Sequence, residues 1–260
     1  MRWAPPEEFV VKAADGVTDL WGLLYKPHDF DPGGSYPIID FLYAGSQSSV
    51  VPRTFTGNRR GVLAQAMAQL GYVTFIVDAR GTPLRGKVFQ DAVYQNIGRH
   101  EIPDHVAALR QLAERRSYID TGRVGVHGYS WGDYFTLRAM LTAPEIFHVG
   151  VSSSPVVDLA ASPEPCEPYL GLPQDNREVW DYASNLRLAK NLEGKLLLTI
   201  GTSDVNTPFA HTMRMVEALT RARKKYDLVI LSEQSHRLSG ASERYWRDAV
   251  KDYFLEHLRP

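Results

Sequence analysis

Residues 128–132, which read GYSWG, constrain this chain more than any other stretch. A short apolar run, residues 124–127, precedes them, and a segment of helical character, residues 133–140, follows them. A serine between two glycines at a strand-to-helix turn is typical of a nucleophile elbow. The turn is so tight that a Cβ at either flank would clash, and the serine takes strained backbone angles. The pattern therefore predicts that Ser130 is a nucleophile. The alternative is an ordinary turn with a helix-capping serine.

Apolar runs alternate with segments of helical periodicity along most of the chain. The runs predict strands over residues 8–13, 18–25, 36–43, 72–77, 124–127, 148–153, 195–200 and 226–231. The periodic segments predict helices over residues 60–70, 101–116, 133–140, 208–224 and 243–258. Residues 14–16 carry a turn signal, so the first two strands form a hairpin. The sequence thus predicts an α/β fold: a mostly parallel sheet of about eight strands with helices on both faces.

Two stretches interrupt this alternation. Residues 79–98 contain glycine and proline breaks and are predicted to be a loop. Residues 154–184 contain five prolines and little periodicity, which is too long for a plain connection in a compact domain. We predict that this second stretch is a Pro-rich insertion packed over one end of the sheet. There is no internal repeat and no linker, so a single domain over residues 1–260 is expected.

The overall composition excludes several classes of partner. The 29 Lys and Arg balance the 30 Asp and Glu, so no nucleic acid and no acidic membrane surface is expected as a partner. No apolar run reaches the roughly 18 residues of a membrane span, and the N-terminal region lacks the apolar stretch of a signal peptide. Cys166 is the only cysteine, which suits a reducing compartment. A cytoplasmic protein is expected.

A serine hydroxyl needs a base to remove its proton during attack, and that base is usually a histidine. When the nucleophile lies on an elbow of this kind, the chain order is serine, acid, histidine. Four histidines follow the elbow: His148, His211, His236 and His257. His236 alone stands in a polar loop after the last predicted strand, where catalytic groups of parallel sheets gather. We predict that His236 is the base. The alternative is a solvent-exposed loop histidine.

The acid that orients this base is expected between Ser130 and His236, just after a strand. Asp204 follows the strand predicted at residues 195–200 and meets this requirement. Asp158 follows the preceding strand and is the competing candidate. Asp78 also ends a strand but precedes the elbow, which favours a role as a loop-organising hydrogen-bond acceptor.

The oxyanion formed on attack requires hydrogen-bond donors aimed at it. One donor at an elbow is the backbone N–H after the nucleophile, here that of Trp131. The second usually comes from the loop after the third strand, where Tyr43 offers a hydroxyl. No cofactor and no metal is expected, because this chemistry needs neither.

Several motifs together resemble the catalytic domain of the prolyl oligopeptidase family, in its dipeptidyl-peptidase-IV-like branch. They are residues 43–45 (YAG), 78–81 (DARG), 128–132 (GYSWG), 169–173 (YLGLP) and 201–206 (GTSDVN), and the resemblance runs from about residue 7 to the C-terminus. It implies an α/β-hydrolase fold, a triad of Ser130, Asp204 and His236, and an oxyanion tyrosine at Tyr43. It further implies a pocket for a small residue such as proline or alanine, formed by Trp131, Val156 and Asn206.

The chain departs from that family in three respects. The family usually carries a β-propeller that gates the site, and this sequence has no room for one. Ala160, Ala161 and Pro165 stand where aromatic residues of the proline pocket are expected. Asp133 and Arg237 replace glycines beside the nucleophile and the base. An acid in the first turn of a helix favours the helix dipole. Asp133 is alternatively a residue that perturbs His236 or binds a cationic substrate group.

These observations predict a serine hydrolase of prolyl oligopeptidase type. Its substrates would be short peptides with a small or proline residue before the scissile bond. The first alternative is a carboxylesterase that uses the same triad on small esters, which an ungated site would favour. A minor alternative is an inactive binding domain, suggested by the departures at Asp133 and Arg237.

Overall fold

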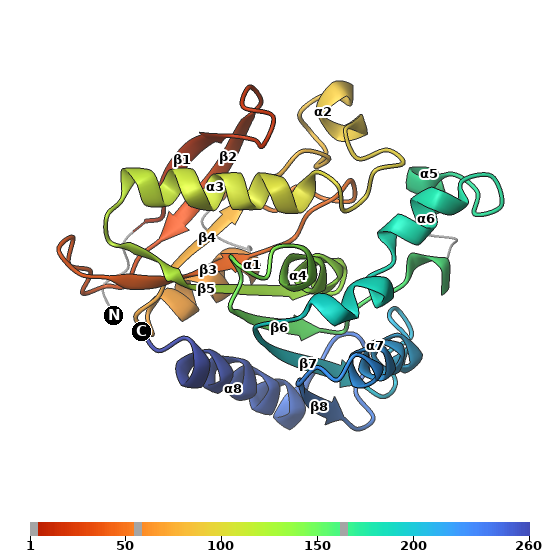
Figure 1. Cartoon of the computed structure of the whole chain (residues 1–260). Coiled ribbons are helices and arrows are strands. Elements are labelled where there is room, and N and C mark those ends of the chain that lie inside the picture. The colour runs from red at the N-terminus through yellow and green to blue at the C-terminus, as the bar shows by residue number, and fades with distance from the viewer. Residues whose placement is uncertain (1–4, 55–58, 162–165) are drawn as a thin grey trace.

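The computed structural model describes residues 5–54, 59–161 and 166–260 (Figure 1). Within these ranges, one eight-stranded sheet has the order β1-β2-β4-β3-β5-β6-β7-β8. The strands are β1 (Glu7–Lys12), β2 (Asp19–Tyr25), β3 (Tyr36–Phe41), β4 (Val73–Val77), β5 (Ile119–Tyr129), β6 (Val149–Ser153), β7 (Lys195–Gly201) and β8 (Asp227–Leu231). The longer helices are α1 (Arg59–Ala68), α3 (Glu101–Arg115), α4 (Trp131–Thr142), α7 (Phe209–Arg221) and α8 (Gly240–His257).

Strand direction places the candidate residues at one edge of the sheet. β1 and β2 form the predicted antiparallel hairpin, and β2 is also antiparallel to β4, whereas β4, β3, β5, β6, β7 and β8 run parallel. At the carboxyl ends, Tyr129 pairs with Ser153, Ser153 with Thr199, and Gly201 with Leu231. The segments that follow β5, β7 and β8 therefore begin at the same level of the sheet.

Helices cover both faces of the sheet, as the sequence predicts. α3, α4 and α7 bury side chains such as Leu109, Leu137 and Met215 in one apolar core. α1 and α8 bury Met67 and Phe254 in a second core on the other face. Packing on both faces explains why the central strands are almost entirely apolar, since neither face meets water.

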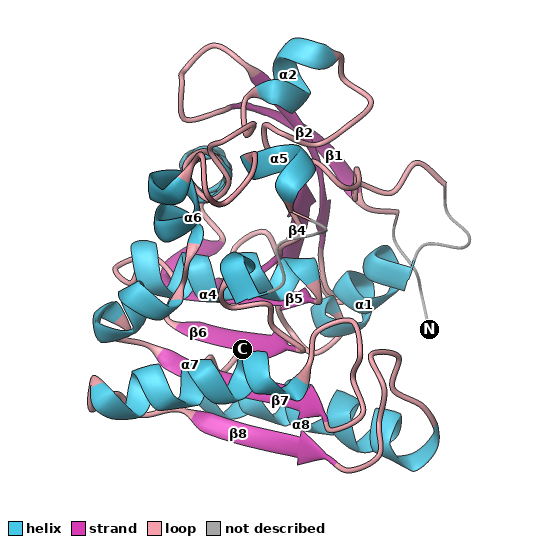
Figure 2. Cartoon of the chain, turned by 90° about the vertical axis from the view of Figure 1, so that its right-hand side faces the viewer, coloured by secondary structure: helices cyan, strands magenta, loops and turns pink. Residues whose placement is uncertain are grey.

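The Pro-rich stretch between β6 and β7 is not structureless. Residues 154–184 contain α5 (Glu167–Leu170), α6 (Arg177–Ala183) and a 3₁₀ turn, Leu159–Ala161, and a second 3₁₀ turn, Leu186–Asn191, follows before β7. The Tyr134 hydroxyl in the first half of α4 donates to the Ala183 carbonyl at 2.8 Å, and Asn185 Nδ2 donates to the Tyr134 carbonyl at 2.9 Å. The insertion is thus fastened to the helix that follows the elbow. In both views α5 and α6 lie apart from α8 (Figures 1 and 2).

The stretch predicted as a loop, residues 79–98, holds one further short helix, α2 (Lys87–Asp91). Five residues are too few to show helical periodicity in a sequence, which is why the prediction missed it.

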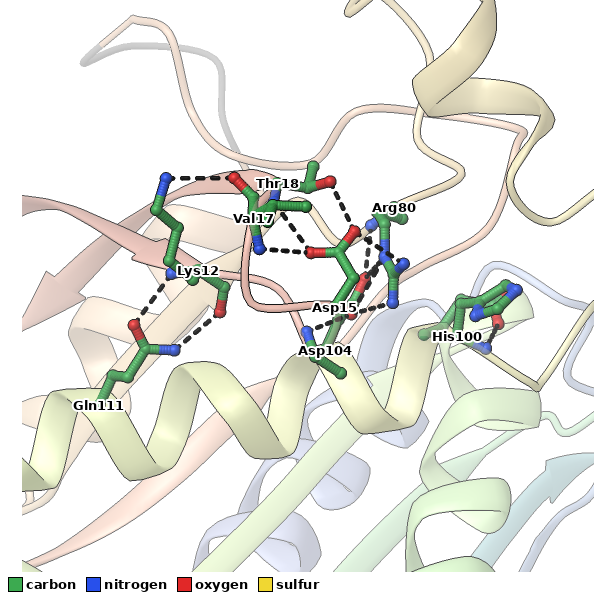
Figure 3. Close-up of polar contacts among 10 residues, drawn as sticks. Lys12, Asp15, Val17, Thr18, Arg80, His100, Asp104 and Gln111 are labelled. Carbon is green, nitrogen blue, oxygen red and sulfur yellow. Dashed lines mark hydrogen bonds and ion pairs between the residues drawn. The ribbon is translucent and has the colours of Figure 1, made fainter.

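A polar cluster fastens the β1–β2 hairpin to α3 (Figure 3). Arg80, which follows β4, donates from Nη2 to Asp104 Oδ1 at 2.8 Å and from Nη1 to Asp15 Oδ2 at 3.0 Å. The Ala14 N–H also donates to Asp104 Oδ1, at 2.9 Å. The guanidinium therefore joins the hairpin turn, the loop after β4 and α3 in one clamp.

Candidate active site

The elbow has the strained geometry that its glycines indicate. Ser130 lies between β5 and α4 with φ 62° and ψ −120°. A Cβ on Gly128 would lie 2.3 Å from the Gly132 carbonyl oxygen. A Cβ on Gly132 would lie 2.6 Å from the Leu42 carbonyl oxygen. Both distances are impossible for a real side chain, so only glycine fits on either side of the serine.

Ser130, His236 and Asp204 form one continuous hydrogen-bonded line. His236 Nε2 lies 2.8 Å from Ser130 Oγ, and His236 Nδ1 lies 2.8 Å from Asp204 Oδ2. The two loops that carry His236 and Asp204 touch one another. The Ser203 N–H donates to the Gln234 carbonyl at 2.9 Å, and a Cβ on Gly201 would lie 2.3 Å from that same oxygen.

Asp204 is held as a carboxylate. Its Oδ1 accepts the N–H groups of Asn206 and Thr207, each at 2.9 Å, and its Oδ2 accepts the Thr207 hydroxyl at 2.8 Å. Burial alone would raise the pKa of Asp204, but the hydrogen bonds from His236 and Thr207 outweigh burial and lower the pKa to about 2. A carboxylate only accepts hydrogen bonds, so His236 donates from Nδ1. Its Nε2 then carries the lone pair that faces the Ser130 hydroxyl.

The competing acid has a different partner. Asp158 Oδ2 forms an ion pair with Arg214 Nη2 of α7 at 2.7 Å. Asp204 is the carboxylate that contacts His236 among the residues that the structure describes. Asp78 accepts the Ser49 hydroxyl at 2.5 Å and the Val50 N–H at 2.7 Å, which is the loop-organising role predicted for it.

Tyr43 lies directly against the elbow. It follows β3, and a Cβ on Gly132 would come within 2.9 Å of its Cδ2 atom. Tyr43 is partly buried, and burial raises the pKa of its hydroxyl, so the group stays protonated and can donate. Trp131 is the first residue of α4, so its backbone N–H follows the serine directly. The structure thus places the Tyr43 ring and the Trp131 N–H at the elbow, and their role as oxyanion donors stays a prediction.

The three residues expected to form the pocket differ in their exposure. The Trp131 indole is only 6% exposed and stacks on the Tyr134 ring at 5.1 Å between centroids. Val156 is half-buried against the first core, and Asn206 is exposed. Little of the Trp131 side chain is therefore available to a substrate, and a shared pocket of these three residues stays a prediction.

The departures from the family, Asp133 apart, are exposed where the structure describes them. Ala160 and Ala161 lie in the 3₁₀ turn after β6. Pro165 lies outside the described residues. Arg237 is exposed beside His236.

Asp133 lies beneath the nucleophile. It is fully buried, and its Oδ2 accepts the Ser130 N–H at 2.9 Å. Burial raises the pKa of this carboxyl well above its usual range. A cationic substrate group cannot reach a buried carboxyl, so that interpretation of Asp133 is wrong. The residue instead ties the first turn of α4 to the nucleophile.

Two neighbours of His236 carry no signal in the sequence. The Tyr129 ring lies 5.2 Å from the His236 ring between centroids, and the Thr207 hydroxyl lies 3.4 Å from His236 Nδ1. Tyr129 is a variable position of the elbow pattern, and Thr207 follows the acid by three residues. Neither position carries a sequence signal by itself, because each acts only through its contact with His236.

Residues 60–260 match the family model described as "Prolyl oligopeptidase family". The chain belongs to the prolyl oligopeptidase family. Among curated members, dipeptidyl peptidase 8 from Homo sapiens is 37% identical over 249 residues, which cover 94% of this chain and 28% of that protein. Prolyl endopeptidase FAP from Homo sapiens is 30% identical, covering 93% of this chain and 32% of that protein.

Two solved structures of similar proteins confirm the α/β-hydrolase fold. A putative dipeptidyl aminopeptidase IV from Bacteroides ovatus superposes with a TM-score of 0.92 at 34% identity, covering 98% of this chain and 36% of that one. Porphyromonas gingivalis dipeptidyl peptidase 4 superposes with a TM-score of 0.90 at 28% identity, covering 99% of this chain and 36% of that one. This member of the prolyl oligopeptidase family thus spans about a third of the length of these relatives.

Residues 5–54, 59–161 and 166–260 offer neither a metal-binding cluster nor a membrane-spanning helix. No three or more His, Cys, Asp or Glu side chains come together there in a way that would hold a metal ion. None of the helices in those ranges combines the length and the apolar character of a membrane span.

Proposed function

We propose that this chain is a serine peptidase of prolyl oligopeptidase type that cleaves short peptides after a small or proline residue. The observation that carries the proposal is the line from Ser130 Oγ through His236 to Asp204, with both contacts at 2.8 Å. The names of the relatives, dipeptidyl peptidase 8 and prolyl endopeptidase FAP, support a peptide as the substrate.

The reaction begins when Ser130 Oγ attacks the carbonyl carbon of the scissile amide. His236 Nε2 takes the hydroxyl proton in the same step, and the resulting imidazolium donates from Nδ1 to Asp204. His236 then passes the proton to the leaving amine, which departs and leaves an acyl-enzyme on Ser130. A water molecule, deprotonated by His236, hydrolyses that ester and restores the serine.

Negative charge develops on the carbonyl oxygen during both steps. The Trp131 N–H and the Tyr43 hydroxyl are the donors that we assign to this oxyanion. Donors of this kind contribute about 10²–10³ in kcat each when they are aimed at the oxyanion in a site of low dielectric. Removing the hydroxyl with Tyr43→Phe therefore lowers kcat by about 10²–10³-fold with little change in folding, and an unchanged kcat would remove Tyr43 from this role.

The acyl side of the substrate is assigned to Trp131, Val156 and Asn206. Alanines at positions 160 and 161, where the family resemblance leads us to expect aromatic residues, favour a second candidate function, a carboxylesterase for small esters. Esters are easier to cleave with the same triad, because an alkoxide is a better leaving group than an amine. A cytoplasmic location and a single domain over residues 1–260 stay predictions.

A covalent probe tests the nucleophile. A fluorophosphonate should label the wild-type chain at one residue, and Ser130→Ala should remove the labelling while leaving the thermal unfolding curve intact. Labelling of the alanine variant would reject Ser130 as the nucleophile. Absence of labelling in the folded wild type would favour the inactive binding domain.

A substrate pair separates the peptidase from the esterase. Ala-Pro- and Gly-Pro-anilides should be hydrolysed by the wild type and not by Ser130→Ala. A short-chain aryl ester measured in parallel gives the ester kcat/KM. Turnover of the ester with no measurable turnover of either anilide would replace the peptidase with the carboxylesterase.

A further inference from the structure

Arg60 contacts the tyrosine that we assign to the oxyanion. Arg60 lies in the first turn of α1, and its guanidinium carbon stands 4.0 Å from the centroid of the Tyr43 ring. A cation over the face of an aromatic ring is attracted by the negative charge of that face. Arginine suits this position because its guanidinium is planar and stays charged at every pH at which proteins fold.

The groups around Tyr43 act on its hydroxyl in opposite directions. Burial raises the pKa of the hydroxyl most, and the Asp133 carboxyl acts in the same direction. The Arg60 charge opposes both, and hydrogen bonds to the Tyr43 hydroxyl from Ser48 and Arg60 also lower its pKa. Of the groups that shift the pKa of the Tyr43 hydroxyl, Arg60 is the positively charged one. Its charge stabilises negative charge on the hydroxyl oxygen and on an oxyanion next to it.

We propose that Arg60 is a positioning residue of the oxyanion hole, which holds the Tyr43 ring against the elbow and strengthens its hydroxyl as a hydrogen-bond donor. This inference rests on the proposed function, because it needs an oxyanion beside Tyr43. The contact is independent of the triad: Arg60 belongs to α1, whereas Ser130, Asp204 and His236 follow β5, β7 and β8.

The charge acts on the transition state more than on the bound substrate. The carbonyl oxygen of a bound amide carries only a partial negative charge, whereas the tetrahedral intermediate carries a full negative charge on that atom. A fixed cation behind the donor therefore lowers the barrier without tightening substrate binding. Loss of Arg60 should appear in kcat and leave KM unchanged.

The test is a double-mutant cycle on Arg60 and Tyr43 with an aryl ester or anilide as substrate. Arg60→Met removes the charge at similar volume and should lower kcat about tenfold at constant KM. Arg60→Lys keeps a cation over the ring and should retain most of kcat. In the Tyr43→Phe background, Arg60→Met should change kcat less than about twofold, because the hydroxyl that the cation strengthens is gone.

Arg85→Met is the matched control. It removes another guanidinium from an aromatic ring, that of Phe89 at 4.2 Å, and should leave kcat unchanged. An equal tenfold loss from Arg60→Met in the Tyr43→Phe background would overturn the inference, because Arg60 would then act without the hydroxyl. An unchanged kcat in the wild-type background would also overturn it.

Fluorophosphonate labelling of Ser130 separates this inference from the proposed function. If the variants are still labelled but the double-mutant cycle shows no coupling between Arg60 and Tyr43 in kcat, the role of Arg60 is rejected and the proposed function stands. A folded wild type that neither labels nor turns over substrate rejects the proposed function, and with it the inference.

Discussion

Two aspartates at opposite regions of this molecule have the same local structure and different roles. Asp15 lies in the β1–β2 hairpin and Asp204 in the loop after β7, and each begins the pattern Asp-x-x-Thr. In both, Oδ1 accepts the N–H groups two and three residues on, and Oδ2 accepts the threonine hydroxyl, from Thr18 at 2.6 Å and from Thr207 at 2.8 Å. In both, hydrogen bonding outweighs burial and lowers the carboxyl pKa to about 2.

The difference lies in the partner that the fold brings to Oδ2. Asp15 receives Arg80 Nη1 at 3.0 Å, and Asp204 receives His236 Nδ1 at 2.8 Å. A guanidinium does not release its proton, so the first pair is a permanent clamp between the hairpin and α3. An imidazole can both accept and release a proton, so the second pair can assist proton transfer. The local Asp-x-x-Thr motif therefore keeps the side chain ionised, and the partner that the fold supplies determines whether the carboxylate has a structural or a candidate catalytic role.

Asp133 shows the effect of burial on a carboxyl that accepts fewer hydrogen bonds. It is fully buried, its Oδ1 has no hydrogen-bond partner among the described residues, and burial raises its pKa. The three aspartates together separate the effect of burial on the carboxyl pKa from the effect of hydrogen bonding.

The largest effect that distinguishes the two regions is expected from Asp204→Asn. Asparagine can still accept the backbone N–H groups but no longer holds His236 in the required tautomer, so kcat should fall about 10⁴-fold. The matched variant Asp15→Asn should leave kcat unchanged. Steady-state kinetics on an aryl ester measures both. A loss of similar size in Asp15→Asn would show that the hairpin clamp also serves the reaction.

A smaller effect is expected from the two threonines. Thr207→Val removes the hydroxyl that supports Asp204 and should lower kcat about tenfold, and it costs about 1 kcal/mol of unfolding free energy because a buried hydrogen bond is lost. Thr18→Val removes the equivalent bond to Asp15 and should leave kcat intact. Kinetics and urea unfolding of both variants measure the contrast, and an unchanged kcat in Thr207→Val would assign that residue to folding alone.

The smallest effect expected is on the dependence of the folding stability on pH and on salt concentration. Each carboxyl has a folded-state pKa below that of an unfolded aspartate, so each stabilises the native state above about pH 4, and this contribution disappears as the pH falls toward 2. The Asp15 side chain is 27% exposed, whereas that of Asp204 is fully buried. Salt screens exposed charges more than buried ones.

Thermal unfolding between pH 6 and pH 2 tests this difference. The destabilisation caused by Asp15→Asn should vanish toward pH 2 and should shrink in 1 M salt. That caused by Asp204→Asn should vanish with acid in the same way and should change less with salt. Equal salt dependence of the two variants would contradict the difference in burial.

Much of the fold follows from patterns that are local in the sequence. The apolar run at residues 36–43 predicts a central strand, and β3 indeed pairs with both β4 and β5. The elbow predicts the close approach that Gly128 and Gly132 permit. His236 was selected by chain order and by its place after the last strand, which is also local information. Its short contact with Ser130 agrees with that selection, and its catalytic role stays a proposal.

Other features could not be read from the sequence, because they depend on groups that are distant along the chain. Asp158 and Asp204 both follow strands, and although the sequence favours Asp204, only the structure shows their partners, which are Arg214 for Asp158 and His236 for Asp204. Arg60 shows no sequence signal, since its role depends on the Tyr43 ring that the fold places beneath it. The burial of Asp133 likewise requires α4 and the strands around it.

The sequence by itself determined the order of strands and helices, the glycine-flanked serine and the carboxylates that cap their own loops. These depend on side-chain periodicity, on steric freedom and on hydrogen bonds that span three residues or fewer. Only the tertiary structure decided which side chain each carboxylate meets, because partners distant along the chain are chosen by proximity in space. Asp15 contacts an arginine and joins two parts of the fold, whereas Asp204 contacts a histidine and is a candidate catalytic acid.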